Sequence, residues 1–283
     1  MSIKTFFHKI KMFFVRSRET SIPYVASGKR YGNYGEDEFV SYLRQVMPMC
    51  KIKKNIIINT HGSHAEIDCL VLYENKLFAI EVKYWKGRLI ETESGFIQEK
   101  VDRWTGELHI KNSKSPFKQL NRAIYLLRKQ IPDKVWINGI VFFGDTEFEG
   151  IETFGNEIWF HNMQQLVQYI SNNGEETVAY NANKFFNNCI AADCLYSENW
   201  DKSLRCRIYE DSLRFQMQTR EIKRSQIRCI KIKHHWSYDE LNITLRSGES
   251  FFIAQENAKI KVDENGLIKE FALCKLDYIE LGI

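Results

Sequence analysis

The first half of the chain shows a helical pattern followed by three runs rich in apolar and β-branched residues. Phe39, Val40 and Leu43 recur at the spacing of one helix face, and Pro48 marks the end of that helix. Polar turns separate the apolar runs that follow, and three strands are predicted over residues 51–59, 67–73 and 77–87. The pattern therefore predicts a helix followed by an antiparallel meander of three strands.

A second helix and a buried strand follow farther along the chain. Pro116 suits the first turn of a helix, and apolar residues recur along one stripe of it. The run at 135–143 is apolar apart from Asn138 and Gly139, which is typical of a strand buried in a parallel or mixed sheet. A strand within 151–161 and a helix over 163–170 would close this domain. We expect an α/β fold with a central mixed sheet flanked by helices.

The C-terminal third has a different pattern, with short alternating runs between closely spaced turns. These runs predict a small antiparallel sheet or barrel, and residues 266–281 have helical periodicity. Several strands capped by one helix resemble the pleckstrin-homology-like fold, although no diagnostic motif supports this. Such domains bind lipids, peptides or proteins. The C-terminal domain could therefore bind a second copy of this chain or another protein. The polar stretch at 171–177 is the candidate boundary, which gives domains over 1–29, 30–175 and 176–283.

The first residues form a short amphipathic pattern. Six apolar residues share one helical stripe, and lysines lie elsewhere on the predicted helix: Ile3, Phe6, Phe7, Ile10, Phe13 and Phe14. Two interpretations stay open. The stripe packs against this protein or a second copy, or residues 1–15 lie on an anionic membrane surface.

Composition and charge narrow the class of protein. Apolar residues make up 44% of the 283 residues and charged residues 27%, as in globular proteins, and no apolar run is long enough to span a membrane. The seven cysteines show no C-x-x-C pair, so we expect reduced thiols and a cytoplasmic location, with residues 1–15 as a peripheral contact at the inner membrane face.

The net charge of +4 hides two basic blocks. Residues 1–30 hold seven basic and one acidic side chain, and residues 201–233 hold ten and four, so each block has a net charge of +6. The outward positions of alternating strands face solvent and are usually polar, which is one interpretation of the block at 201–233. The competing interpretation is a surface that binds nucleic acid or anionic lipid.

The strongest chemical signal lies on two neighbouring predicted strands. Glu81 and Lys83 are two residues apart and share a face, and the preceding strand can bring Asp68 close to Glu81. Carboxylate oxygens suit Mg²⁺ or Mn²⁺, which would lower the pKa of a water molecule and offset charge on a scissile phosphate. The pattern E-x-K is common as a surface ion pair, but here its flanks are strongly apolar, where charges are costly unless they are paired or bound to a metal.

Four segments in order resemble a known family: GNYGEDEF, AEIDCLVLYENKLFAIEVKYWKGRL, SPFKQLNRAIYLL and INGIVFFGD. They are similar to the nuclease-related domain, NERD, over roughly residues 30–150. The resemblance implies a PD-(D/E)xK, restriction-endonuclease-like core with Asp68, Glu81 and Lys83 as its D…ExK residues. It further implies that Glu36 supports the metal and that Gln119 orients the lysine, the water or the phosphate. Ser115 stands where the family usually has asparagine.

Other residues are weaker candidates. Gln119 is alternatively a hydrogen-bonded core glutamine, since it lies on the inward stripe of its helix. Lys86 and Arg88 follow the E-x-K strand and are candidate phosphate contacts. Trp85 and Trp104 are candidates for stacking on bases, with packing as the alternative.

Three functions compete on this sequence. The first is a Mg²⁺-dependent nuclease that acts on DNA as an endonuclease, in DNA repair or in defence against foreign DNA such as that of phages, with RNA as the other substrate. The second is a non-catalytic module that binds nucleic acid with the nuclease fold. The third is a membrane-surface scaffold.

Overall fold

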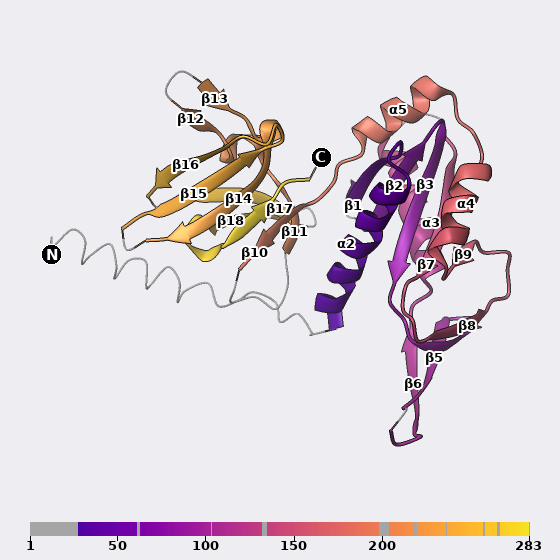
Figure 1. Ribbon diagram of the computed structural model, residues 1–283. Coiled ribbons are helices and arrows are strands. Elements are labelled where there is room, and N and C mark those ends of the chain that lie inside the picture. The colour runs from indigo at the N-terminus through magenta and orange to yellow at the C-terminus, as the bar shows by residue number, and fades with distance from the viewer. Residues whose placement is uncertain are drawn as a thin grey trace. The chain divides into compact units, whose positions relative to one another are not determined.

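The computed structural model contains two compact units (Figure 1). The first unit comprises residues 31–191, and the second contains residues 192–283. The structure describes residues 28–60, 63–102, 104–131, 135–197, 204–217, 220–235, 237–256, 258–264 and 267–282. The amphipathic stripe predicted at residues 3–14 lies outside this part of the chain.

A mixed sheet forms the centre of the first unit. Its described strands have the order β1-β2-β3-β7-β9, and they are Lys51–Thr60, Ser63–Tyr73, Lys76–Lys83, Ile137–Phe143 and Trp159–Phe160. The first three form the predicted antiparallel meander, whereas β7 and β9 run parallel to β3 and β7 respectively. The buried run at 137–143 is therefore a strand of a mixed sheet, as its largely apolar pattern predicts.

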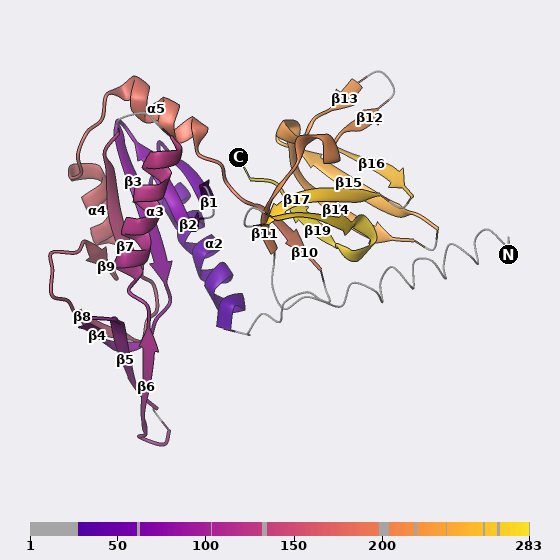
Figure 2. The ribbon, with the colours of Figure 1, turned by 180° about the vertical axis from the view of Figure 1, so that it is seen from behind.

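Helices cover both faces of this sheet. Helices α2 (Gly28–Val46) and α4 (Met163–Asn172) pack against one face, and α3 (Pro116–Gln130) and α5 (Ala179–Asn188) pack against the other (Figures 1 and 2). The alternation within β3 produces the two layers, because Phe78, Ile80 and Val82 face α2 while Leu77 and Ala79 face α3. The mixed α/β class is confirmed.

A smaller sheet extends from the end of β3. Its described strands have the order β6-β5-β4-β8, and they are Leu108–Ser113, Gly95–Val101, Gly87–Thr92 and Phe148–Glu152. Phe96 of β5 packs against Phe117 of α3 with ring centroids 6.0 Å apart, which joins the base of this sheet to the main core. The free part of the β5–β6 hairpin projects away from the unit (Figure 1).

The first unit extends to Ala191, beyond the boundary expected near residue 175. Helix α5 accounts for the difference, because Phe185 and Phe186 are buried in the core beneath the sheet. Lys53 of β1 also reaches the end of this helix and donates hydrogen bonds to the carbonyl groups of Asn187 (3.2 Å) and Cys189 (2.8 Å). A cation suits this position because the last carbonyls of a helix carry partial negative charge.

The second unit is a β structure. Its main sheet has the order β16-β15-β14-β19-β10-β11-β17-β18 among the described strands, and β12 pairs with β13. These strands are Asp193–Tyr196, Leu204–Ile208, Phe215–Met217, Arg220–Ile222, Ile227–His234, Asp239–Leu245, Ser250–Gln255, Lys259–Glu264, Leu267–Ala272 and Tyr278–Glu280, numbered β10 to β19 in order. The predicted antiparallel character is thus present.

The prediction of a helix over residues 266–281 is wrong. This stretch forms strand β18, a short 3-10 turn at Leu273–Lys275 and strand β19. Strand β18 pairs with β17 from Lys259↔Ala272 to Glu264↔Leu267, so cross-strand pairing overrides the helical spacing. The described residues of this unit contain no α-helix, so they provide no capping helix for the pleckstrin-homology-like fold.

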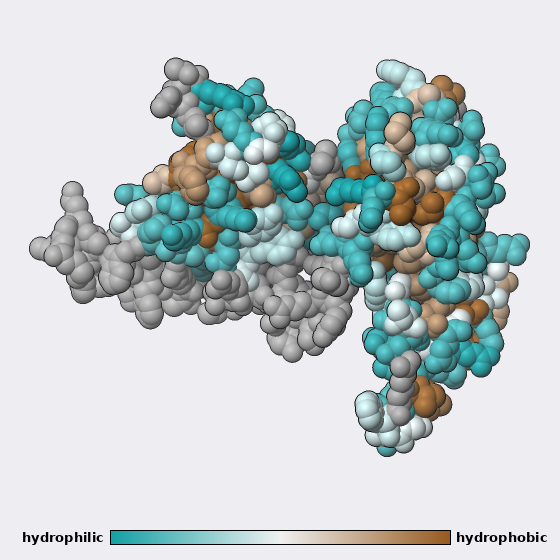
Figure 3. Space-filling view, viewed as in Figure 1, coloured by the Kyte–Doolittle hydropathy of each residue, from teal (hydrophilic) through white to brown (hydrophobic). Residues whose placement is uncertain are grey.

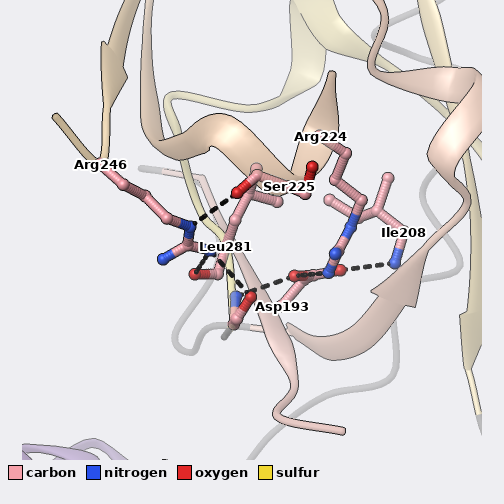
Figure 4. A network of polar contacts seen from close by, with 7 residues as sticks. Asp193, Ile208, Arg224, Ser225, Arg246 and Leu281 are labelled. Carbon is pink, nitrogen blue, oxygen red and sulfur yellow. Dashed lines mark hydrogen bonds and ion pairs between the residues drawn. The ribbon is translucent and has the colours of Figure 1, made fainter. Parts of the chain in front are cut away.

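A buried ion pair ties the ends of the second unit together (Figure 4). Asp193 is fully buried, and its carboxylate accepts hydrogen bonds from the side chain of Arg224 (2.5 Å) and from the backbone N–H groups of Ile208 (2.7 Å) and Gly282 (2.9 Å). One carboxylate thereby connects the first strand of the unit with its last residues. Arg246 adds hydrogen bonds to nearby backbone carbonyl groups.

Candidate active site

Asp68, Glu81 and Lys83 meet on the face of the sheet that α3 covers. Strands β2 and β3 pair with Cys69 opposite Ile80, and the same register brings Asp68 opposite Glu81. The Nζ atom of Lys83 donates a hydrogen bond to Oε1 of Glu81 and lies 3.8 Å from Oδ2 of Asp68. The structure thus brings together the three residues that strand alternation predicted to converge.

Glu81 is the most deeply buried member of the group. Its side chain is 0% exposed, and its Oε1 accepts a second hydrogen bond, 2.8 Å long, from Nε2 of Gln119. Its Oε2 is buried and has no hydrogen-bond partner among the described residues. Burial and the neighbouring Asp68 carboxylate raise the pKa of Glu81 to about 8, although the Lys83 ammonium acts in the opposite direction.

Asp68 and Lys83 have opposite charges in the same small space. Oδ2 of Asp68 accepts a 2.8 Å hydrogen bond from the backbone N–H of Val82, which fixes the carboxylate against β3. Burial by itself would lower the pKa of Lys83, but the Asp68 and Glu81 carboxylates raise it above its ordinary value. Lys83 therefore stays protonated beside the two acids.

Helix α3 carries Gln119 to this group. Ser115 caps the helix, since its hydroxyl accepts a 3.2 Å hydrogen bond from the N–H of Lys118, and Pro116 occupies the first turn. Leu120, three residues after Phe117, packs into the same core. Ser115 thus fixes the start of the helix, and Gln119 is held there against Glu81.

Tyr84 follows β3 and ties the end of this strand to α2. This role was not predicted from the sequence. The Tyr84 hydroxyl donates a 2.8 Å hydrogen bond to the carbonyl of Gly35 in α2. A Cβ atom at Gly35 would lie 2.1 Å from the Tyr84 ring, and one at Gly144 would lie 2.7 Å from it. The two glycines therefore leave the space that the ring fills, and their occurrence in otherwise bulky segments is the signal that could have revealed it.

Glu36 follows Gly35 but does not complete a three-carboxylate cluster. Helix α2 packs on the opposite face of the sheet from Asp68 and Glu81, and the charge of Glu36 contributes to raising the pKa of Lys83. In the part of the chain that the structure describes, no three acidic, histidine or cysteine side chains are grouped as ligands of one metal ion.

The two candidate phosphate contacts are paired with acids. Nζ of Lys86 lies 3.4 Å from Glu147 and 4.0 Å from Asp145. Arg88 forms an ion pair with Glu152. Both cations are substantially exposed, so a nucleic acid would have to compete with these carboxylates for them.

The donor set fits a divalent cation at one place. Oε2 of Glu81 is a buried oxygen without a hydrogen-bond partner among the described residues, and such a group is costly unless something binds it. The carboxylate of Asp68 lies across the strand pair from it. Hard oxygen donors of this kind suit Mg²⁺ or Mn²⁺, which complete their shells with water.

The two tryptophans have different environments. Trp85 packs against the main core, with its ring centroid 6.2 Å from that of Phe143. Trp104, in the turn of the β5–β6 hairpin, is 96% exposed. Trp104 is therefore free to contact a ligand, whereas Trp85 has a packing role.

Comparison with known proteins identifies one family. The model of the nuclease-related domain matches residues 31–144, which confirms the resemblance seen in the sequence. The match includes all five residues of the predicted catalytic group: Glu36, Asp68, Glu81, Lys83 and Gln119. No curated protein and no solved structure matches the chain.

Proposed function

We propose that the first unit is a nuclease that uses Mg²⁺ or Mn²⁺ to hydrolyse phosphodiester bonds. The observation that carries the proposal is the buried, unpartnered Oε2 of Glu81 beside Asp68 and Lys83. The family match supports a nuclease-related function for the same residues. Metal dependence, the substrate and the reaction are our inference from this chemistry.

Asp68 and Glu81 would hold the cation, with Glu36 as a more distant contributor of negative charge. When bound, the cation supplies Lewis acidity, which makes a water molecule more acidic and offsets the charge of the phosphate. Gln119 and the N–H of Val82 hold the two carboxylates in place, so that little reorganisation accompanies binding.

Lys83 has the direct role in the chemistry of the phosphate. In hydrolysis, the water oxygen forms a bond to phosphorus as the bond to the leaving sugar oxygen breaks, and negative charge grows on the phosphoryl oxygens. The Lys83 ammonium, which lies beside the carboxylates, would stabilise this charge. Gln119 keeps Glu81 oriented and leaves its second oxygen free.

We infer DNA as the substrate, cut internally, with RNA as the alternative. Residues 31–200 hold 18 basic and 22 acidic side chains, so this part of the chain has no excess of positive charge. The basic block at 201–233 would supply the attraction to phosphate. DNA repair or defence against foreign DNA is the role we propose. A membrane contact through residues 1–15 stays a prediction from the sequence.

A second candidate function is a module that binds nucleic acid without cutting it. The observation in its favour is that Lys83 already contacts both carboxylates, so that the charges of the group are largely compensated without a metal ion. In this case the ion pair has the structural role of stabilising the end of β3.

Cleavage assays distinguish the two candidates. Supercoiled plasmid, linear duplex, single-stranded DNA and RNA are incubated with Mg²⁺, Mn²⁺ or EDTA. A nuclease converts at least one substrate only when the cation is present, and cutting of the circular plasmid makes it an endonuclease. Folded protein that binds DNA but leaves every substrate intact with either cation supports the non-catalytic module.

A further inference from the structure

A cavity of about 560 Å³ lies beside α3, apart from the carboxylate group. It is bounded by one side of α3, by the start of β7 and by residues 156–158. Gly139 helps to leave this space, since a Cβ atom there would lie only 3.1 Å from Cδ1 of Ile124. The volume is within the range of about 300–1,000 Å³ that is usual for small-molecule sites.

One end of the cavity is aromatic and positively charged. The guanidinium carbon of Arg128 lies 5.3 Å from the centre of the Trp136 ring, and both residues line the cavity. Nε of Arg128 is buried and has no hydrogen-bond partner among the described residues. This end therefore offers an aromatic surface, a positive charge and an unused N–H donor.

The other end offers acceptors and amide groups. Oε2 of Glu157 is buried and also lacks a hydrogen-bond partner within the described chain. Glu157 lines the cavity, and its carboxylate lies against Gly155, where both oxygens would be 2.7 Å from an added Cβ atom. Asn121 lines the same end. Asn121 and Arg128 are seven residues apart on α3, which corresponds to about 10 Å along the helix axis.

We propose that this cavity binds a nucleotide, with its base toward Glu157 and its phosphate toward Arg128. A carboxylate accepts hydrogen bonds from adjacent N–H groups, and guanine presents a ring N–H and an exocyclic amine side by side, so a guanine nucleotide fits best. Trp136 supplies the aromatic contact and Arg128 the countercharge for the phosphate. The nucleotide is either a free mononucleotide or one nucleotide of a strand.

The cavity is separate from the proposed catalytic group but shares a helix with it. Gln119 faces Glu81, whereas the next residues along α3, Leu120 and Asn121, line the cavity. Nucleotide binding does not require that the first unit cleaves nucleic acid. The inference therefore stands or fails independently of the proposed nuclease.

Calorimetric titration of the full chain in EDTA tests the inference. GMP, AMP, CMP and UMP are titrated first, and then a short single-stranded oligonucleotide with one guanine and its counterpart without guanine. We expect GMP to bind and affinity to fall at least tenfold in both Trp136→Ala and Glu157→Gln. Glu93→Gln and Tyr180→Ala, which change an exposed carboxylate and an exposed aromatic residue outside the cavity, should bind like the wild type.

The outcomes separate the two sources of the ligand. If only the guanine-containing oligonucleotide binds, and both cavity variants lose that binding, the site accepts a nucleotide within a strand. Absence of binding by every probe, or unchanged affinity in the folded Glu157→Gln variant, overturns the proposal. Circular dichroism verifies folding, and Glu157→Gln retains the size of the side chain if Trp136→Ala fails to fold.

Discussion

At the residue scale, the group depends on a carboxylate placed where an apolar side chain would ordinarily lie. Glu81 interrupts a strand whose other core residues are apolar, and burial of a charge is costly unless it is paired. Lys83 and Gln119 satisfy one of its oxygens and leave the other free. That asymmetry distinguishes the group from an ordinary buried ion pair, in which both oxygens would be satisfied.

The pKa of Glu81 makes stability depend on pH. Its folded value of about 8 lies above the ordinary value of 4.5, so between these pH values the folded protein binds a proton that the unfolded chain releases. Without metal, the free energy of unfolding should fall as pH rises from about 4.5 to about 8, by at most about 1.4 kcal/mol per pH unit from this group. Urea titrations in EDTA at several pH values measure this dependence of the free energy of unfolding on pH. Glu81→Gln should remove this contribution, and identical slopes in the two proteins would contradict the assignment.

Replacement of Lys83 separates catalysis from folding. In Lys83→Ala we expect cleavage to slow by about 10²–10³-fold, because a charge that stabilises the phosphoryl oxygens is lost. The free energy of unfolding at pH 7 should change by less than about 1 kcal/mol, because the pKa of Glu81 is raised to about 8, so this carboxyl already carries a proton at that pH and is not left as an unpaired charge. Lys54→Ala, which removes a lysine that pairs with Asp37 outside the group, is the control. Wild-type cleavage rates in Lys83→Ala would exclude the catalytic role.

Strand alternation was sufficient to predict the convergence of Asp68, Glu81 and Lys83, because a short turn fixes their two strands as neighbours. The position of Glu36 was less accessible, since a helical pattern does not reveal which face of a sheet the helix covers. The ion pairs of Lys86 and Arg88 were also not predictable, because their partners are far away in the sequence.

At the element scale, the β5–β6 hairpin exposes several large apolar side chains of the first unit. Val101, Leu108 and Ile110 are more than half exposed, and Figure 3 shows apolar surface at its free end. Trp104 lies in the turn, where Oδ1 of Asp102 accepts hydrogen bonds from the N–H groups of Trp104 and Thr105. These two hydrogen bonds fix the backbone of Trp104 and Thr105, whereas the Trp104 side chain contacts little of the protein.

This exposure leads to a binding prediction that rests on the proposed function. Trp104→Ala should weaken binding of single-stranded DNA by about 5- to 150-fold, which corresponds to the 1–3 kcal/mol typical of one stacked base. The melting temperature of the Trp104→Ala variant should equal that of the wild type, because Trp104 is almost fully exposed. Tyr180→Ala, at another exposed aromatic residue, is the control in a fluorescence anisotropy titration. Equal affinities of Trp104→Ala and the wild type for single-stranded DNA would show that Trp104 does not stack on a base.

Elements with strong local patterns were predictable, and those that depend on distant partners were not. The helix at 116–130 and the strands of the meander have clear periodicity and caps. By contrast, α5 has few periodic apolar residues and is stabilised by Lys53 and the core. Residues 267–280 satisfy a helical spacing, but pairing with β17 and with β14 makes them strands.

At the scale of the whole molecule, the position of the boundary can be tested by truncation. Residues 28–191 should fold alone with a single cooperative transition. Residues 28–175 should be strongly destabilised, because they lack the buried Phe185 and Phe186, and loss of a buried phenylalanine side chain typically costs about 3–5 kcal/mol. Thermal melts followed by circular dichroism compare the two fragments. Equal melting temperatures would place the boundary near residue 175 after all.

The second unit should respond independently to its own buried ion pair. Asp193→Ala removes the partner of Arg224 and leaves a cation in a largely buried place, which typically costs about 3–5 kcal/mol. We expect calorimetry of the full chain to show one destabilised transition, with the transition of the first unit unchanged. A uniform shift of all transitions would show that the two units unfold together.

The central claim is that Asp68 and Glu81 form a metal-dependent catalytic pair. The most direct measurement is the rate of plasmid cleavage by wild type, Asp68→Asn and Glu81→Gln, with Mg²⁺, Mn²⁺ and EDTA, and with Glu93→Gln and Glu107→Gln as exposed carboxylate controls. The account predicts cation-dependent cutting by the wild type and both controls, and a loss of at least 100-fold in the two site variants. Equal cutting by a folded site variant, or cutting that persists in EDTA, would contradict it.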